Sequence, residues 1–247
     1  MSFLFVCIKE ENKMNFMLLA KSLGEQFYNT LIKDNRYMLY LEGLGNTLLT
    51  SLGAIIVGLI IGLCIALVLY VNKKFGSLKI LKWICDIYIY IIRGTPVVLQ
   101  LMIMYFVVLV FIPNGITVAI ITFGLNSAAY VAELFRGGLE SVDHGQLEAG
   151  LSLGLNNTQT LTKIIIPQGM RTSLPALCNE FIALVKETSV MGYIAILDVT
   201  FAARMIQSRT LDAFVPLIIS AIIYLVLITI LTVLLRQVER RLSRGQR

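Results

Sequence analysis

Several ionisable residues stand in a segment that is otherwise apolar enough to cross a membrane. Asn179 and Glu180 precede the run Lys186-Glu187-Thr188-Ser189. On an ideal helix Glu180 and Glu187 share one face, because seven residues make almost two full turns. A charged group is costly inside a bilayer, so such residues are functional candidates by default. A carboxylate in a dry cavity favours an ammonium group, either an α-amino group or the side chain of Lys or Arg.

A structural role is the alternative for Glu180, either through pairing with Lys186 or by capping a neighbouring backbone. Six residues correspond to about 600°, which leaves these two side chains about 120° apart on an ideal helix. Glu180 also lies about 13 Å along the helix beyond Arg171, at the depth of the hydrocarbon core. We therefore predict that Asn179, Glu180 and Glu187 line a cavity and bind substrate.

Other kinds of chemistry lack the residues that they need. His144 is the single histidine, so a His-based metal cluster or a Ser-His-Asp triad is incomplete. The four cysteines form no C-x-x-C pair. Neither a G-x-x-x-x-G-K-[ST] phosphate loop nor a G-x-G-x-x-G fingerprint occurs. We therefore expect no metal, no cofactor and no enzymatic activity in this chain, and any ATP must be hydrolysed by a partner.

The composition indicates that lipid is the solvent. Of the 247 residues, 57% are hydrophobic and 15% charged, and the mean hydropathy is +0.81, far from the mix of a soluble domain. The net charge of +6 does not indicate nucleic acid, because basic and aromatic residues do not interleave. Only helices and closed barrels satisfy backbone groups in lipid, and these segments are too long for barrel strands. We predict an all-α, polytopic membrane helix bundle.

The apolar segments predict five transmembrane helices, since about 20 apolar residues cross the hydrocarbon core. They are expected at residues 43–71, 96–112, 116–135, 172–196 and 213–235. Residues 83–92 are expected to form an interfacial helix, which Arg93-Gly94-Thr95-Pro96 then breaks. The predicted organisation is an N-terminal extension with an interfacial helix over 1–42, a transmembrane domain over 43–240 and a basic tail over 241–247.

Two further patterns bear on packing and orientation. Gly58 and Gly62 form a G-x-x-x-G pair, which serves either close packing of helices or a dimer seam. Four lysines without an acid lie within residues 72–82, and the tail carries five arginines against Glu239. Short basic segments stay in the cytoplasm. We therefore predict an outside N-terminus and a cytoplasmic C-terminus.

The longest polar stretch between spans, residues 136–163, contains a motif of small residues and leucines. It reads Gly145-Gln146-Leu147-Glu148-Ala149-Gly150-Leu151-Ser152-Leu153-Gly154, and after nine residues follows Ile164-Ile165-Ile166-Pro167. The small residues would let a short helix sit close against a partner, and Leu147, Leu151 and Leu155 predict an apolar stripe. An ordinary amphipathic connector on the membrane surface is the alternative.

This segment resembles the EAA motif of bacterial ABC importer permeases, with Gly150 in place of an alanine and Ile166 in place of a leucine. Arg93-Gly94-Thr95-Pro96 and Glu133-Leu134-Phe135-Arg136-Gly137-Gly138 look like elements of the polar amino acid branch. The resemblance covers roughly residues 38–240. It implies a cytoplasmic coupling helix whose contacts with an ATPase involve Glu148, Ala149, Gly150, Gly154 and Pro167.

The resemblance further implies the permease subunit of an ATP-driven, binding-protein-dependent importer of amino acids, with polar or cationic ones favoured. Its partners would be a dimer of ABC ATPases, an extracytoplasmic solute-binding protein and a second permease, as a homodimer or heterodimer in a bacterial cell membrane. Arg204 and Arg209 are candidates to meet acids of the binding protein.

Two other classes of membrane protein fit the sequence less well. An ion-gradient-driven secondary transporter would usually show an internal repeat of broken helices, and none is visible in the sequence. An intramembrane enzyme would need paired catalytic groups at span depth, whereas Asp86 stands alone near a loop.

Overall fold

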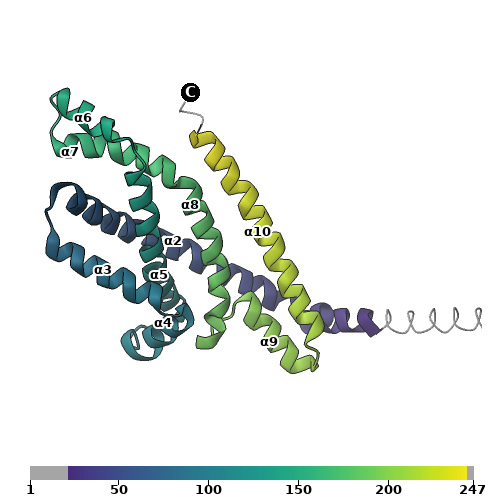
Figure 1. The fold of residues 1–247 in the computed structure, drawn as a ribbon. Helices are drawn as coiled ribbons and strands as arrows, with labels where there is room; N and C mark the ends of the chain where they lie inside the picture. Colours follow the sequence, from purple (N-terminus) through teal and green to yellow (C-terminus); the bar gives the residue numbers. More distant parts are fainter. Residues whose placement is uncertain (1–21, 244–247) are drawn as a thin grey trace, which may run out of the picture.

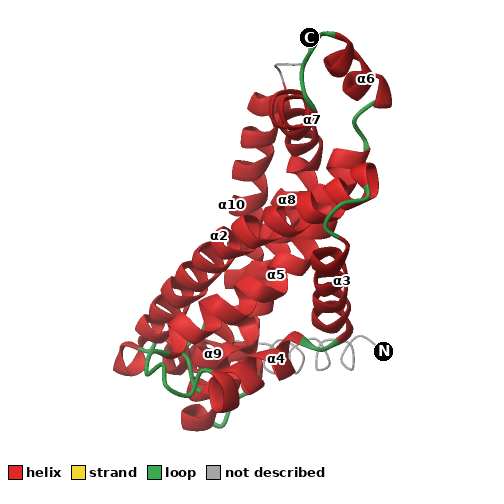
Figure 2. Ribbon diagram, turned by 90° about the vertical axis from the view of Figure 1, so that its left-hand side faces the viewer, coloured by secondary structure: helices red, strands yellow, loops and turns green. Residues whose placement is uncertain are grey.

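Helices make up all the regular secondary structure of the residues described in the computed structural model, 22–243 (Figure 2). Residues 1–21 of the predicted N-terminal extension and residues 244–247 of the predicted tail lie outside the described residues. Three helices are long and apolar enough to cross a membrane by themselves: α2 (Tyr37–Phe75), α5 (Gly115–Glu140) and α10 (Phe214–Ser243). The prediction of an all-α polytopic bundle is confirmed.

Two further pairs of helices meet the length and hydropathy of a span only when the two members are taken together. α3 (Lys79–Gly94) and α4 (Val97–Ile103), which continues into the π-helix η3 (Met104–Val108), are bent by 107° at their junction. α8 (Ile166–Glu187) runs through the 3₁₀ segment η5 (Thr188–Ile194) and bends by 44° into α9 (Val199–Thr210). Each bent pair counted as one span gives up to five.

The predicted span over 96–112 is in the structure a shorter helical segment, Val97–Val108, which counts as a span only together with α3. Thr95 is extended (φ −123°, ψ 145°), and Pro96 begins the next helical segment. Proline has no N–H and disfavours helical geometry in the residue before it, so the chain turns at this point. The predicted interfacial helix over 83–92 is therefore the middle of α3, which packs against α2 and α5.

Glycines set the close packing of α2 on α5. A methyl carbon at Gly62 would lie 2.6 Å from Val131 Cγ1, and one at Gly58 would lie 3.1 Å from Ser127 Oγ. The G-x-x-x-G pair of α2 therefore serves packing within the chain, as small residues do between membrane helices.

A second tight crossing joins α5 to α8. A methyl carbon at Gly138 would lie 1.8 Å from Ser173 Oγ and 2.6 Å from the Gly169 carbonyl oxygen. On the other side of the contact, one at Gly169 would lie 2.9 Å from Leu139 Cα. The two backbones therefore meet with no room for a side chain at either glycine.

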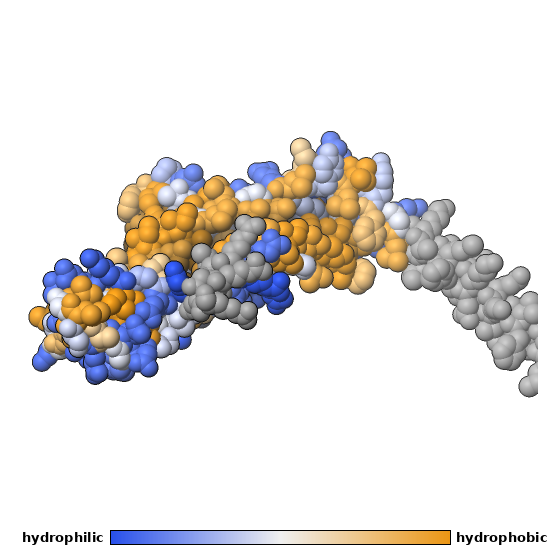
Figure 3. All heavy atoms as spheres, turned by 90° about the horizontal axis from the view of Figure 1, so that it is seen from above, coloured by the Kyte–Doolittle hydropathy of each residue, from blue (hydrophilic) through white to orange (hydrophobic). Residues whose placement is uncertain are grey.

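The bundle has two distinct ends. α6 (His144–Ser152) and α7 (Asn157–Thr160) lie at one end, together with the C-terminal end of α10, while α4 and α9 lie at the opposite end (Figures 1 and 2). We call these the α6 end and the α9 end. Seen from above, hydrophilic residues gather at the α6 end and hydrophobic surface extends along much of the remaining molecule (Figure 3).

Candidate coupling and transport sites

Local hydrogen bonds fix the segment that carries the predicted coupling motif. The Asp143 carboxylate accepts a hydrogen bond of 2.6 Å from the Gly145 N–H and so caps α6. Gly154 follows the end of α6 with a φ of +84°, a conformation that glycine adopts without steric cost. Asn156 and Gln159 then form a capping box that starts α7. α6 and α7 thus form a helical hairpin around a glycine turn.

The exposed surface of α6 differs from the predicted stripe. Leu147 packs partly buried against the core, and Leu155 lies beyond the end of the helix, so the stripe of Leu147, Leu151 and Leu155 was wrong. The exposed apolar residues are Leu151 and Leu153, at 42% and 81% exposure. Helical spacing missed Leu153, because this residue belongs to the turn before Gly154. Figure 3 shows a hydrophobic patch surrounded by hydrophilic residues at this end.

The five predicted coupling residues fall into two groups. Glu148 and Ala149 are exposed on α6. Gly150 is buried, and a methyl carbon there would lie 2.5 Å from Thr160 Cγ2 of α7. Gly154 forms the turn, and the exposed Pro167 stands in the first turn of α8. Gly150 therefore faces the chain's own hairpin, and not a partner as the small-residue surface had suggested.

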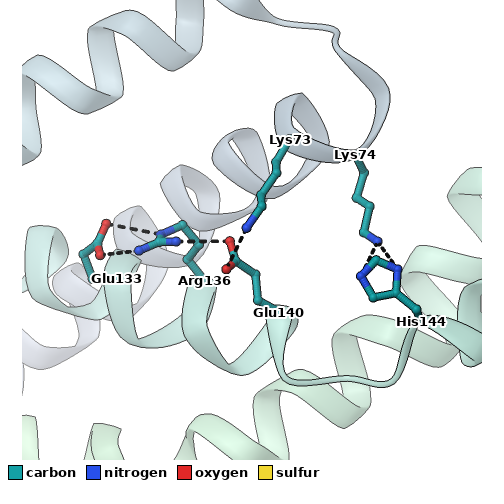
Figure 4. Close-up of polar contacts among 6 residues, drawn as sticks. All are labelled: Lys73, Lys74, Glu133, Arg136, Glu140 and His144. Carbon is teal, nitrogen blue, oxygen red and sulfur yellow. Dashed lines mark hydrogen bonds and ion pairs between the residues drawn. The ribbon is translucent and has the colours of Figure 1, made fainter.

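An ion-pair network joins the helices just inside the α6 end (Figure 4). Arg136 of α5 donates to both oxygens of Glu133, at 3.3 and 2.7 Å, and to Glu140 at 3.1 Å. Lys73 of α2 lies 2.9 Å from the other oxygen of Glu140, and Arg93 of α3 lies 4.0 Å from Glu133. The network therefore brings together the two sequence blocks that contain Arg93 and Glu133.

A separate contact links α2 to the first residue of α6. Lys74 Nζ lies 2.8 Å from His144 Nδ1 and 3.4 Å from Nε2 (Figure 4). Exposed polar pairs of this kind contribute about 0–1 kcal/mol each. Their effect here is on geometry, because the contacts of Lys73 and Lys74 hold the end of α2 against α5 and against the coupling segment.

The predicted transport residues lie along α8. Asn179 is exposed, and Glu180 and Glu187 are half-buried. Ser127 of α5 donates a hydrogen bond of 2.9 Å to Glu180 Oε1. Among residues 22–240, whose side chains the structure describes, no cationic group lies within 4 Å of either carboxylate. The structure thus contains no pair between Glu180 and Lys186, and it directs Glu180 toward α5.

The α9 end presents an arginine on an aromatic ring. The Arg204 guanidinium lies 5.4 Å from the centre of the Tyr193 ring, and Tyr193 is 50% exposed. Arg204 also lines a shallow groove with Gln207, Ser208 and Leu211. This groove combines a cation, an amide, a hydroxyl and an exposed leucine, a composition that suits contact with another protein.

Comparison with known proteins identifies relatives over most of the chain. The arginine transport system permease protein ArtQ of Bacillus subtilis (strain 168) is 38% identical over 206 residues, which cover 82% of this chain and 92% of ArtQ. The L-cystine transport system permease protein TcyB of the same organism is 32% identical over 231 residues, with coverage of 91% and 95%.

Solved structures agree with this result. A crystal structure of an amino acid ABC transporter with histidines superposes with a TM-score of 0.75 at 39% identity, and covers 83% of this chain and 94% of that chain. The MetNI methionine ABC transporter in an inward-facing conformation gives a TM-score of 0.74 at 20% identity, which shows likeness of fold alone, with coverage of 83% and 97%.

These matches confirm the predicted resemblance to ABC importer permeases. A family model described as "Binding-protein-dependent transport system inner membrane component" matches residues 54–244, well over half of the chain. The chain therefore belongs to the family of inner membrane components of binding-protein-dependent transport systems.

Proposed function

We propose that this chain is the permease through which an ATP-driven importer moves amino acids, with polar or cationic ones favoured. The observation that carries the substrate class is Glu180, a half-buried carboxylate about 21 Å along α8 that has no ion pair with the described side chains of residues 22–240. Such a group suits the ammonium of an amino acid. The names of the relatives, which specify arginine and L-cystine, support the same class. Asn179 and Glu187 extend the proposed substrate surface along α8.

Members of this family are the membrane components of the transporter, and ATP hydrolysis belongs to a separate ATPase. In this chain, the proposed ATPase contact consists of exposed residues of the motif, Glu148, Ala149, Leu151 and Leu153. Glu148 is placed to pair with a base of the ATPase. Gly150, Gly154 and Pro167 act by shaping the hairpin and its entry into α8.

The α6 end is proposed to face the cytoplasm. Lys73 and Lys74 end α2 at this side, and Lys79 and Lys82 begin α3. Basic residues next to short connections favour the cytoplasmic side. Because α10 ends at the same side (Figure 1), this orientation also gives a cytoplasmic C-terminus and places the start of α2 outside.

Two protein contacts complete the proposed assembly. α10 is apolar over most of its length, and only 11% of its most apolar window is buried, so its faces are open to lipid and to a second permease, identical or closely related. At the opposite end of the bundle, the groove around Arg204 would receive the solute-binding protein. Charge complementarity at such a surface mainly accelerates encounter.

Uptake by reconstituted vesicles tests the substrate site. Glu180→Gln keeps the shape of the side chain and removes its charge, and a charge-assisted hydrogen bond is roughly twice as strong as a neutral one. We expect a loss of about tenfold in uptake of a cationic amino acid, and a smaller loss for a neutral one. Glu42→Gln, an exposed glutamate of α2, is the matched control. Equal uptake by Glu180→Gln and the parent for every amino acid would show that Glu180 is not part of the site.

Co-purification tests the ATPase contact. Leu153→Ser removes the most exposed apolar side chain of the hairpin without touching the core, so the permease should insert normally but lose most of the ATPase on size-exclusion chromatography. Leu211→Ser makes the same change at the α9 end, where Leu211 is 92% exposed, and should retain the ATPase. Full ATPase recovery with Leu153→Ser would rule out this surface.

A further inference from the structure

The elbow between α3 and α4 leaves backbone carbonyls without helical partners. The last four carbonyls of any helix lack a partner within the helix, and Pro96 has no N–H to offer. α3 is 16 residues long, so the elbow lies about 24 Å from its start. Where such an apolar segment lies in lipid, an unsatisfied carbonyl costs several kcal/mol.

Two of these carbonyls, those of Ile91 and Ile92, accept hydrogen bonds from the side chains of Thr95 and Gln100. Gln100 Nε2 lies 2.7 Å from the Ile92 carbonyl oxygen, 3.1 Å from that of Thr95 and 2.8 Å from Thr95 Oγ1. The Thr95 hydroxyl in turn donates to the Ile91 carbonyl at 2.9 Å. The side-chain amide of Gln100, in the first turns of α4, therefore caps the C-terminal end of α3.

The other half of the same amide is bound to α5. Asn126 Nδ2 donates to Gln100 Oε1 at 2.9 Å, and Asn126 is only 3% exposed. Only the nitrogen of the Gln100 amide is used to cap the carbonyls. The bond from Asn126 to its oxygen therefore adds a link between the elbow and α5. Because the amide has one oxygen and one nitrogen, the two bonds fix its orientation.

Three consecutive residues of α5 are held at this level by three different helices. The Leu125 carbonyl accepts a hydrogen bond from the Tyr88 hydroxyl of α3. Asn126 is bound to Gln100 of α4, and the fully buried Ser127 donates to Glu180 of α8. A polar layer thus crosses the bundle from the elbow to the proposed transport carboxylate.

We propose that Gln100 is a positioning residue for the transport site: its amide clamps the α3–α4 elbow to α5 and so holds Ser127 in place against Glu180. The inference rests on the proposed role of Glu180 in binding substrate. Loss of the clamp leaves Asn126 and two carbonyls without their partner, and each unsatisfied buried group costs about 1–3 kcal/mol. α5 then shifts relative to the elbow to recover hydrogen bonds, and the Ser127–Glu180 contact shifts with it.

The test measures how the transporter distinguishes arginine from glutamine, with the binding protein saturated by each amino acid in turn. Gln100→Met keeps the length of the side chain and removes both hydrogen-bonding groups. The complex with the ATPase is reconstituted with Gln100→Met, with Glu180→Gln and with both changes. Thr122→Val is the matched control, because Thr122 is a buried hydroxyl of α5 that bonds only to Val118 of its own helix.

We expect Gln100→Met to lower the ratio of arginine to glutamine uptake about fivefold, and Thr122→Val to leave it unchanged. If Gln100 acts through Glu180, the double variant shows no further fall beyond Glu180→Gln alone, because coupled residues are not additive. A ratio equal to the product of the two single effects would overturn the positioning role while the substrate site stands. An unchanged ratio in Glu180→Gln would remove the substrate site, and this inference with it.

A second variant tests the same link in case Gln100→Met fails to fold. Asn126→Ala cuts the same link from the side of α5 and leaves the bonds from Gln100 to α3 in place. It should lower the uptake ratio like Gln100→Met. If both variants lose the assembled complex while Thr122→Val retains it, Gln100 is a structural clamp only and the positioning role is refuted.

Discussion

The crossing of α5 and α8 predicts a large effect from a single methyl group. In Gly138→Ala the new carbon would lie 1.8 Å from Ser173 Oγ and 2.6 Å from the Gly169 carbonyl oxygen. The serine hydroxyl can rotate away, but the carbonyl belongs to the backbone, so the helices must separate. Overpacking of this kind costs about 1–3 kcal/mol. For a chain of this size, 2 kcal/mol corresponds to a fall in Tm of about 4–8 °C.

The neighbouring glycine supplies the control for this prediction. Gly137 lies in the same helix, but a methyl carbon there meets nothing within 4 Å, and alanine is about 1 kcal/mol better than glycine inside a helix. Thermal unfolding of the purified permease in detergent should therefore give a lower Tm for Gly138→Ala and an unchanged or higher Tm for Gly137→Ala. Ser173→Gly should restore part of the loss in Gly138→Ala. Equal Tm values for the two alanine variants would refute the close crossing.

Three further predictions address the coupling segment, the ion-pair network and the orientation. Gly154→Ala should cost about 1–2 kcal/mol of stability because residue 154 has a positive φ, and it should lower both Tm and ATP-driven uptake. Gly154→Asn should recover most of both losses. Identical behaviour of the two variants would contradict the left-handed turn at residue 154. Arg136→Met removes the cation shared by Glu133 and Glu140, leaving Glu133 with Arg93 at 4.0 Å and Glu140 with Lys73, and should lower Tm by a few degrees. Arg136→Lys should recover only part of the loss, since lysine lacks the bidentate geometry. An unchanged Tm in Arg136→Met would show that Arg136 adds no stability. A reporter fused after Arg247 should read as cytoplasmic, and an external signal would reverse the proposed topology.

The bundle of membrane helices was predictable because lipid imposes length and hydropathy directly on the sequence. The long spans α2, α5 and α10 overlap the predicted segments at 43–71, 116–135 and 213–235. The elbow at Thr95-Pro96 was visible as a break, but not its angle of 107°. The elbow is held by Gln100 of α4 and its hydrogen bond from Asn126 of α5, which lies 26 positions further along the chain.

The candidate sites were predicted less completely, for reasons of geometry. The motif around Glu148 indicated a short helix. The sequence does not show, however, whether a glycine such as Gly154 adopts a positive φ in a turn or serves close packing. The inward orientation of Gly150 depends on the return of Thr160 through α7. Glu180 was predicted as a site residue because a carboxylate is costly inside a membrane segment. Its hydrogen-bond partner Ser127 lies 53 positions earlier in the chain, and no local sequence pattern connects the two residues.

The exposed leucines of the α6–α7 hairpin have a consequence for the biogenesis of the transporter. Leu151 and Leu153 project from a hairpin whose other exposed residues are polar or small, and an exposed apolar patch promotes aggregation until a partner covers it. Under the proposed ATPase contact, a permease made in excess of its ATPase would leave this patch open, whereas an assembled permease would cover it. Synthesis of the two subunits in matched amounts would therefore limit aggregation of the permease.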